Sequence, residues 1–261
     1  MIQRRSFITG ALAGAAVGAL IGKVGATHAA PPQPPPTPEP QPQAPSEGRL
    51  SFSQQGEDIV LFHVLRDLLK LSAPTYLDIG AAEPVLGSNT YLLYCTGSRG
   101  VLVEPNPEYV EKLRLRRPND VVVAAGVGVG KETEADYYVI RDHAPLNTFS
   151  REVVAKLRAG ASVDPVERVV RMPLVPVNEV IATHLGKAPD LLSIDVEGLD
   201  LAILKTLDFG NYRPGAIIAE AIPMDSPGVN SELVKFLLSK RYVVRGGSTI
   251  NTVFVDSKRC G

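Results

Sequence analysis

The sequence predicts an α/β domain built on a mostly parallel sheet whose last strand runs antiparallel. Short apolar strands alternate with amphipathic helices from about residue 48 to residue 261, which is typical of a parallel sheet covered by helices on both faces. The last two strands are joined through a tight turn at Gly246-Gly247-Ser248, and so short a connection fits only antiparallel strands. Hydrophobic residues make up 44% of the chain and charged residues 21%, an ordinary globular balance.

In the first half of this domain, a helix over 54–70 is expected because apolar residues form one broad face and Ser53 can cap the first turn. The short apolar run 75–79 ends at Gly80 and is typical of a buried strand. Pro107 favours a helix start, which indicates a helix over 107–116. The other elements expected here are a helix over 90–96 and strands over 100–103, 121–125 and 136–140.

In the second half, an extended segment over 169–175 leads into a helix over 178–185. The run 191–196 is expected to be a buried strand because it is apolar almost throughout, and a helix over 199–207 follows it. The remaining expected elements are a strand over 216–219, a helix over 231–240 and strands over 242–245 and 252–255.

The first thirty residues are expected to be an export signal rather than part of the fold. Arg4 and Arg5 precede an uncharged, Ala/Gly-rich run over 6–22, and small residues follow up to residue 30. The arginine pair resembles a bacterial twin-arginine signal, which would place the domain in the periplasm or on a membrane. The alternative is a membrane anchor, since the run 6–22 is at the lower limit of a membrane span.

Residues 31–47 are expected to be a linker between the signal and the domain over 48–261. More than half of residues 31–45 are proline, which favours an extended polyproline II segment without helix or sheet. The whole chain is nearly neutral, with 27 basic and 28 acidic residues, so its charge does not indicate a nucleic-acid partner. Its two cysteines, Cys95 and Cys260, cannot form a disulfide framework or a four-cysteine zinc site.

Candidate ligand-binding residues stand at the ends of two consecutive strands. Asp78 and Gly80 end the first strand, where the glycine allows a sharp turn and close approach of a ligand. Glu104 ends the next strand, and its carboxylate can accept hydrogen bonds from both hydroxyls of a ribose. Dinucleotide binding is disfavoured, because Glu83 would repel a pyrophosphate and Pro84 lacks an N–H. A nucleoside without phosphates, such as S-adenosylmethionine (SAM), is the expected ligand.

With these features, the domain resembles the FkbM family of SAM-dependent methyltransferases over roughly residues 51–256. The resemblance rests on Ser53-Gln54-Gln55-Gly56-Glu57-Asp58, Asp78-Ile79-Gly80-Ala81, Ser88-Asn89-Thr90, Val103-Glu104-Pro105 and Leu192-Ser193-Ile194-Asp195-Val196-Glu197-Gly198. It implies the Rossmann-like, seven-stranded methyltransferase fold with the strand order of that family. It also implies that Asp78, Gly80 and Ala81 line the methionyl part of SAM and that Glu104 holds the ribose. Asn89 is a further candidate SAM contact, with helix capping as the alternative.

Asp195 and Glu197 are the candidate catalytic residues. They are two positions apart at the end of a buried strand, so in an extended chain both side chains point the same way. They could accept the proton of a substrate hydroxyl. They could also bind a divalent metal ion, with Glu220 as a third ligand. The structural alternative is that Glu197 caps a helix and Asp195 bonds to the backbone.

FkbM relatives are linked to O-methylation, so the expected function is an O-methyltransferase acting on a hydroxyl of a sugar, glycan or secondary metabolite. Export conflicts with this expectation, because SAM is made in the cytoplasm. A domain exported folded with SAM bound would make at most one turnover, and a misassigned start would leave a cytoplasmic enzyme. The other alternative is an exported, non-catalytic ligand-binding or structural module on a methyltransferase fold.

Overall fold

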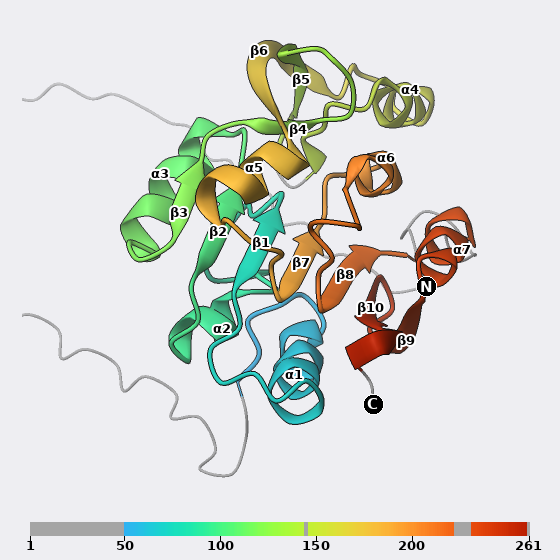
Figure 1. Cartoon of the computed structure of the whole chain (residues 1–261). Coiled ribbons are helices and arrows are strands. Elements are labelled where there is room, and N and C mark those ends of the chain that lie inside the picture. The colour runs from blue at the N-terminus through green and yellow to red at the C-terminus, as the bar shows by residue number, and fades with distance from the viewer. Residues whose placement is uncertain (1–49, 144–145, 222–230, 260–261) are drawn as a thin grey trace, which may run out of the picture. The chain divides into compact units, whose positions relative to one another are not determined.

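A seven-stranded sheet forms the centre of the structure, a computed structural model that describes residues 50–143, 146–221 and 231–259 (Figure 1). The order of its strands is β3-β2-β1-β7-β8-β10-β9. All neighbours from β3 to β8 are parallel, and β10 is antiparallel to both β8 and β9. The strands are β1 (Tyr76–Ile79), β2 (Gly100–Val103), β3 (Val121–Val123), β7 (Leu191–Ile194), β8 (Ala216–Glu220), β9 (Tyr242–Gly247) and β10 (Asn251–Asp256). The Rossmann-like methyltransferase fold is therefore confirmed.

The three central parallel strands end level with one another. Ile79 of β1 pairs with Val103 of β2 and with Ile194 of β7. The residues that follow these strands therefore start from one edge of the sheet, which is where α/β proteins of this kind bind ligands.

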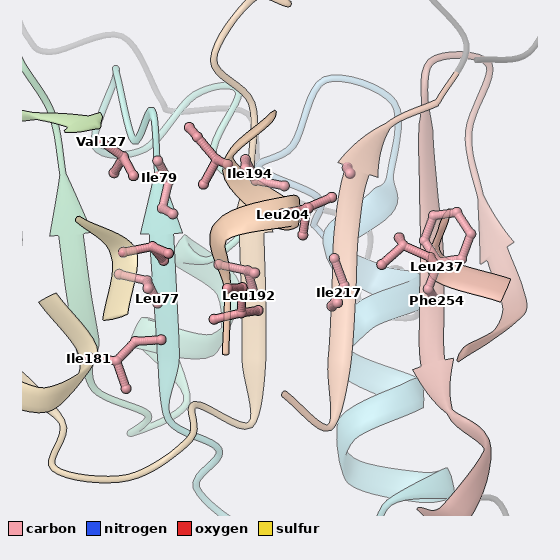
Figure 2. Packing of buried hydrophobic residues seen from close by; sticks show 14 of the residues in the cluster. Leu77, Ile79, Val127, Ile181, Leu192, Ile194, Leu204, Ile217, Leu237 and Phe254 are labelled. Carbon is pink, nitrogen blue, oxygen red and sulfur yellow. The ribbon is translucent and has the colours of Figure 1, made fainter. Parts of the chain in front are cut away.

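Helices cover both faces of the sheet because its strands are apolar on both sides. On one face, Leu77, Ile79, Leu192 and Ile217 pack in a buried cluster against helices α5 (Val177–His184), α6 (Asp200–Thr206) and α7 (Ser231–Ser239) (Figure 2). On the other face, the alternate residues of the same strands pack against α1 (Glu57–His63), α2 (Tyr91–Cys95) and α3 (Pro107–Arg116). Asp78 and Ser193 alternate with the first cluster, so they point toward α1, α2 and α3.

The first helix is shorter than the expected 54–70. The α1 helix starts after Gly56, whose φ of 92° lies in the left-handed region, and after residue 63 it continues as a π-helical segment over Val64–Leu68. The Ser53 hydroxyl accepts hydrogen bonds from the N–H groups of Gly56 (3.1 Å) and Asp58 (3.2 Å). Ser53 therefore does cap the first turn, although Gly56 occupies the N-cap position.

A second, three-stranded sheet with the order β4-β6-β5 lies beyond the carboxyl ends of the central strands (Figure 1). Its strands are β4 (Gly126–Gly128), β5 (Glu134–Ile140) and β6 (Val166–Pro176), and α4 (Arg151–Ala159) lies in the β5–β6 connection. The sequence predicted one strand over 121–125, whereas β4 and α4 were not predicted. The chain instead leaves the large sheet after Val123 and joins β6, and Gly126 is required there because a Cβ atom would lie 2.5 Å from the Phe149 ring.

The final hairpin turns later than expected. Gly246 and Gly247 belong to β9 rather than to the turn, and residues 248–250 reverse the chain, with the Ser248 N–H donating to the Asn251 carbonyl oxygen (2.8 Å). The expected signal over 1–30, including the uncharged run 6–22, and the linker over 31–47 lie outside the described residues. Within residues 50–143, 146–221 and 231–259, no helix is long and apolar enough to cross a membrane.

Candidate functional site

Gly80, Glu104 and Asp195 follow the level ends of β1, β2 and β7, and hydrogen bonds to neighbouring strands hold the backbone of each. The Gly80 N–H donates to the Val103 carbonyl (2.9 Å), the Glu104 N–H to the Val123 carbonyl (3.0 Å) and the Asp195 N–H to the Ile79 carbonyl (3.0 Å). The ladder therefore continues one residue past each strand, so that these residues sit on rigid elements rather than in free loops.

Two cavities open at this edge. The first has an empty volume of about 580 Å³ and extends from Glu104 to the small sheet, where Tyr137, Asn147 and Phe149 line it. The second, of about 660 Å³, extends from Asp78 toward Gln54 and the loop before α2. The residues that line both cavities are Gly80, Ala82, Tyr109, Asp195 and Glu197.

Gly80 is required by the close approach of the β7 end. Its φ of +82° lies in the left-handed region, and an added Cβ would lie 1.9 Å from the Asp195 carbonyl oxygen. No side chain can be accommodated at that distance without moving the strand end. Glycine at position 80 therefore allows the ends of β1 and β7 to lie close together where residues line both cavities.

Glu104 lines the first cavity with its carboxylate held from both sides. Its two oxygens accept hydrogen bonds from the N–H groups of Ala82 (2.9 Å) and Asn106 (2.7 Å). Each oxygen keeps a further lone pair that can accept another hydrogen bond. Burial raises the pKa of Glu104 to about 7, although these two hydrogen bonds lower it and the charge of Asp78 adds to the rise.

Asp78 lies in the floor of the second cavity and is almost fully buried. The Thr90 hydroxyl donates a hydrogen bond of 2.6 Å to its carboxylate. Burial raises the pKa of Asp78, while the positive charge of Arg117 and hydrogen bonds from Thr90 and Ser193 counteract that rise.

Ala81 and Asn89 also line the second cavity, so the structure brings them together with Asp78 and Gly80. Asn89 does not occupy the N-cap position of α2; Thr90 does, without a side-chain cap hydrogen bond. The expected alternative, in which Asn89 serves the helix as a cap, is not what the structure shows.

Asp195 is half-buried and lines both cavities. Burial raises the pKa of its carboxyl to about 6, and the nearby charges of Asp78 and Glu57 contribute to the rise. No hydrogen bond to this carboxylate is found from any of the described residues. An aspartate with a raised pKa that faces open space is suited to accept a proton.

Glu197 lines the same two cavities, but the backbone conformation that places it there differs from the expected one. β7 ends at Ile194, and Glu197 has a φ of +53°, so the chain between Asp195 and Glu197 is not extended, in contrast to the prediction. The Thr148 hydroxyl donates to the Glu197 carbonyl oxygen (3.0 Å) and holds this turn against the small sheet. The left-handed turn, rather than strand periodicity, places the Glu197 side chain beside Asp195.

The expected metal-ligand set does not form. Across residues 50–143, 146–221 and 231–259, no three His, Cys, Asp or Glu side chains are arranged to hold a metal ion. Glu220 is the last residue of β8 and lines neither cavity, whereas Asp195 and Glu197 line both. Asp195, Glu197 and Glu220 therefore do not form the three-ligand set considered from the sequence.

Several residues of the site were not identified from the sequence. Tyr109 of α3 lines both cavities, and Tyr137, Asn147, Thr148 and Phe149 come from the small sheet and the segment before α4. The Asn147 side chain accepts from the Ile140 N–H (2.8 Å), which fixes this segment against β5. The sequence offered one signal for this region, namely Ser150, a good helix-capping residue. Its hydroxyl caps α4 by accepting a hydrogen bond from the Val153 N–H (3.3 Å).

The match to known proteins decides the family. The family model described as the methyltransferase FkbM domain matches residues 78–244, more than half of the chain and all of the strand-end carboxylates described above. The chain belongs to the FkbM methyltransferase domain family. This FkbM domain is accordingly a SAM-dependent methyltransferase. No curated protein matches the sequence.

Solved structures similar to this FkbM domain include a TehB-like SAM-dependent methyltransferase from Corynebacterium glutamicum (11% identity, 78% of this chain and 89% of that chain covered, TM-score 0.38). Another is an O-methyltransferase from Bacillus cereus in complex with S-adenosylhomocysteine (SAH) (12%, 76% and 80%, TM-score 0.35). A third is magnesium protoporphyrin IX methyltransferase from Synechocystis with bound SAM (9%, 77% and 77%, TM-score 0.40). Likenesses this distant give no information on the acceptor.

Proposed function

We propose that this FkbM domain is an O-methyltransferase that transfers the methyl group of SAM to a hydroxyl of a sugar, glycan or secondary metabolite. The observation that carries the proposal is the wall shared by the two cavities. There Gly80 allows the end of β7 to approach β1 closely, and Asp195 and Glu197 present their carboxylates. A nucleoside in the first cavity and an amino-acid group in the second would have their junction at this wall.

The polar groups of the two cavities support this orientation of SAM. The Glu104 carboxylate retains acceptor capacity for the ribose hydroxyls in the first cavity. In the second cavity, Asp78 can accept from the ammonium group of the methionyl part, and Ala81 and Asn89 line the same space. The sulfonium lies between these two parts of SAM, and in this orientation it is next to Asp195 and Glu197.

In the proposed reaction, bound SAM supplies an electrophilic methyl group. The Asp195 carboxylate accepts the proton of the acceptor hydroxyl as the new C–O bond forms and the S–C bond breaks, which leaves neutral SAH. A carboxyl pKa of about 6 leaves Asp195 mainly ionised at neutral pH and makes it a stronger base than an ordinary aspartate. Glu197 at the same wall orients the hydroxyl toward the methyl group.

The cavity walls favour an uncharged acceptor. Among the described residues, the side chains that line the two cavities include Asp78, Glu83, Glu104, Asp195 and Glu197 but no lysine, arginine or histidine. A polyanionic acceptor such as nucleic acid would meet repulsion from these carboxylates. This supports sugars, glycans and neutral metabolites as acceptors and argues against nucleic acid.

The proposal is tested by incubating the full chain with SAM carrying a labelled methyl group and a panel of neutral sugars and polyols. We expect label in an acid-stable, ether-linked methyl product together with formation of SAH. Binding of SAM without transfer to any acceptor of the panel would instead favour the non-catalytic ligand-binding module.

The affinity for SAH is expected to fall as the pH decreases from about pH 8 to about pH 6. Burial holds the pKa of Glu104 at about 7, and the ribose hydroxyls bind best to its ionised form. Binding below that pKa therefore requires release of a proton, so the affinity should fall by up to about tenfold per pH unit. Calorimetry at several pH values measures this slope, and Glu104→Gln, which cannot titrate, should flatten it. An equal slope in the variant would contradict the assignment.

We also propose that the chain is exported by a twin-arginine signal, with a periplasmic or membrane-tethered domain as the result. Arg4 and Arg5 support this proposal, because a general secretory signal requires only positive charge. Replacing both by lysine in a bacterial host is expected to retain the full-length protein in the cytoplasm, as measured by fractionation. Unchanged export would favour an ordinary signal or an anchor through residues 6–22, and a wild-type chain that stays cytoplasmic would favour a misassigned start.

A further inference from the structure

A fully buried arginine lies beneath the second cavity. Arg117 directly follows α3, and its side chain and that of Asp120 are both 0% exposed. The two form an ion pair of 2.8 Å between the arginine Nε and an aspartate oxygen. A buried arginine is tolerated only where its N–H donors are well paired, because its desolvation is costly. The hydrogen-bond partners of Arg117 therefore indicate which part of the structure it holds in place.

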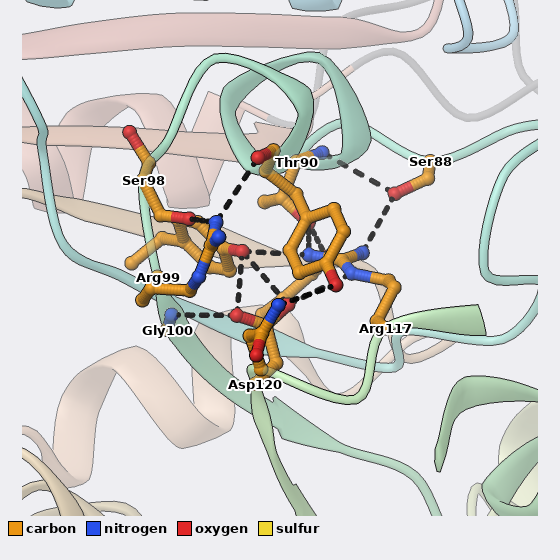
Figure 3. Close-up of polar contacts among 11 residues, drawn as sticks. Ser88, Thr90, Ser98, Arg99, Gly100, Arg117 and Asp120 are labelled. Atoms are coloured by element: carbon orange, nitrogen blue, oxygen red, sulfur yellow. Dashed lines mark hydrogen bonds and ion pairs between the residues drawn. The ribbon is translucent and has the colours of Figure 1, made fainter. Parts of the chain in front are cut away.

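Three further donor contacts of Arg117 reach hydroxyl groups (Figure 3). Its guanidinium donates to the hydroxyl oxygens of Ser88 (3.3 Å), Tyr76 (3.0 Å) and Thr90 (3.0 Å). Two of these partners, Ser88 and Thr90, belong to the loop between β1 and α2 and to the start of that helix. One planar side chain thus joins the end of α3 to the loop that forms one wall of the second cavity.

The contact with Thr90 fixes the direction of a hydrogen-bond chain. An arginine can only donate, so the Thr90 oxygen accepts from Arg117 and its single hydrogen remains available. That hydrogen is donated to the Asp78 carboxylate over 2.6 Å. The chain therefore runs from Arg117 through Thr90 to Asp78, with Asp78 always the acceptor.

Arg117 influences the second cavity through its effect on Asp78, although it does not line the cavity itself. Asp78 and Ser88 line the second cavity, whereas Arg117 and Thr90 line neither cavity. The positive charge of Arg117 lowers the pKa of Asp78 against the effect of burial, and it is the largest of the interactions that do so. Asp195 and Glu104, which follow the neighbouring strands, and Asp120 are the acidic groups nearby.

We propose that Arg117 is a positioning residue for the methionyl part of SAM: through the Thr90 hydroxyl it fixes the Asp78 carboxylate as the acceptor for the SAM ammonium group. This inference rests on the proposed orientation of SAM. Loss of the Arg117–Thr90–Asp78 chain should weaken the binding only of ligands that carry the amino-acid part, because only these contact Asp78. Methylthioadenosine, which has the nucleoside but no amino-acid part, would not depend on the chain.

The test compares SAH and methylthioadenosine by calorimetry on the full chain. Thr90→Val keeps the side-chain shape but removes the hydroxyl, and is expected to weaken SAH binding about tenfold, since a hydrogen bond that orients a charged acceptor is lost. Methylthioadenosine binding should change by less than about twofold. Thr90→Ser, which retains a hydroxyl, should restore SAH binding.

Arg117→Lys tests the other end of the chain, because a lysine keeps the charge but cannot contact Asp120, Ser88 and Thr90 together. We expect the same selective loss of SAH affinity, and if this variant does not fold, Thr90→Val decides the question. Tyr76→Phe is the matched control: it removes hydrogen bonds to Arg117 and Asp120 but leaves Thr90 and Asp78 intact. It should lower the melting temperature without changing the ratio of the two affinities.

Equal weakening of both ligands by Thr90→Val would show a merely structural role and overturn the proposal, as would unchanged SAH affinity. If the wild-type chain binds methylthioadenosine but SAH no more tightly, the methionyl subsite itself is wrong. If it binds neither, the proposed SAM site fails and this inference fails with it. The affinities of the wild-type chain for SAH and methylthioadenosine therefore separate a failure of the proposed SAM site from a failure of this inference alone.

Discussion

Replacing Asp195 by asparagine is expected to lower methyl transfer about 10²–10⁴-fold, the usual effect of removing a general base, while SAH affinity stays nearly unchanged. The reason is that Asp195 lies at the wall shared by both cavities, with a raised pKa and no hydrogen bond to its carboxylate from the described residues. Asparagine keeps the size of the side chain but cannot accept the proton. Single-turnover rates with saturating SAM measure the effect.

The matched variants separate chemistry from structure. Glu197→Gln should lower the rate less than Asp195→Asn, because Glu197 orients the hydroxyl rather than accepting its proton. Glu179→Gln, an exposed glutamate in the first turn of α5, should leave the rate unchanged. Full activity of both site variants would contradict the account, as would unfolding of both. Loss of activity on chelation with recovery on adding Mg²⁺ would contradict the metal-free mechanism.

Replacing Glu104 by alanine is expected to weaken SAH binding by about 1.5–3 kcal/mol, or roughly 10–150-fold, because a charged acceptor for two ribose hydroxyls is lost. The loss should be as large for methylthioadenosine, which carries the same ribose. This pattern differs from that of the Thr90 variant, so calorimetry with the two ligands assigns each residue to its part of SAM.

Glu108→Ala is the control for that experiment, since Glu108 lies four residues further on, in the first turn of α3, and its side chain is exposed. It should bind both ligands as the wild type does. Removal of Glu104 also frees the N–H groups of Ala82 and Asn106, so the melting temperature of the variant without ligand must be measured. Wild-type affinity in a folded Glu104→Ala protein would refute the ribose assignment.

The central part of the fold could be predicted because its signals are local. The strands β1, β2 and β7 are buried on both faces, so the sequence of each is a short, mostly apolar run that ends where polar residues begin. Pro107 marks the start of α3, whose observed bounds are those expected. The same local signals placed Asp78, Gly80, Glu104 and Asp195 at strand ends, and the parallel register brought them together.

The remaining features depend on contacts that no local pattern encodes. The β4 segment, Gly126–Gly128, is a strand only because β6 pairs with it. The α4 helix is an exception, because Ser150 caps it and its apolar residues recur at helical spacing; it buries only Val154. Arg117 stands beside other arginines at the end of α3 and differs from them only because the chain turns there and directs its side chain inward. The left-handed turn at Glu197 likewise follows from packing against the small sheet.

Isothermal titration of the full-length chain with SAH tests the central claim most directly, that the strand-end carboxylates of this FkbM domain form a SAM site. We predict saturable binding with about one SAH per chain and an affinity that falls in Glu104→Ala and in Thr90→Val. The absence of saturable binding, in protein that unfolds cooperatively on heating, would contradict it.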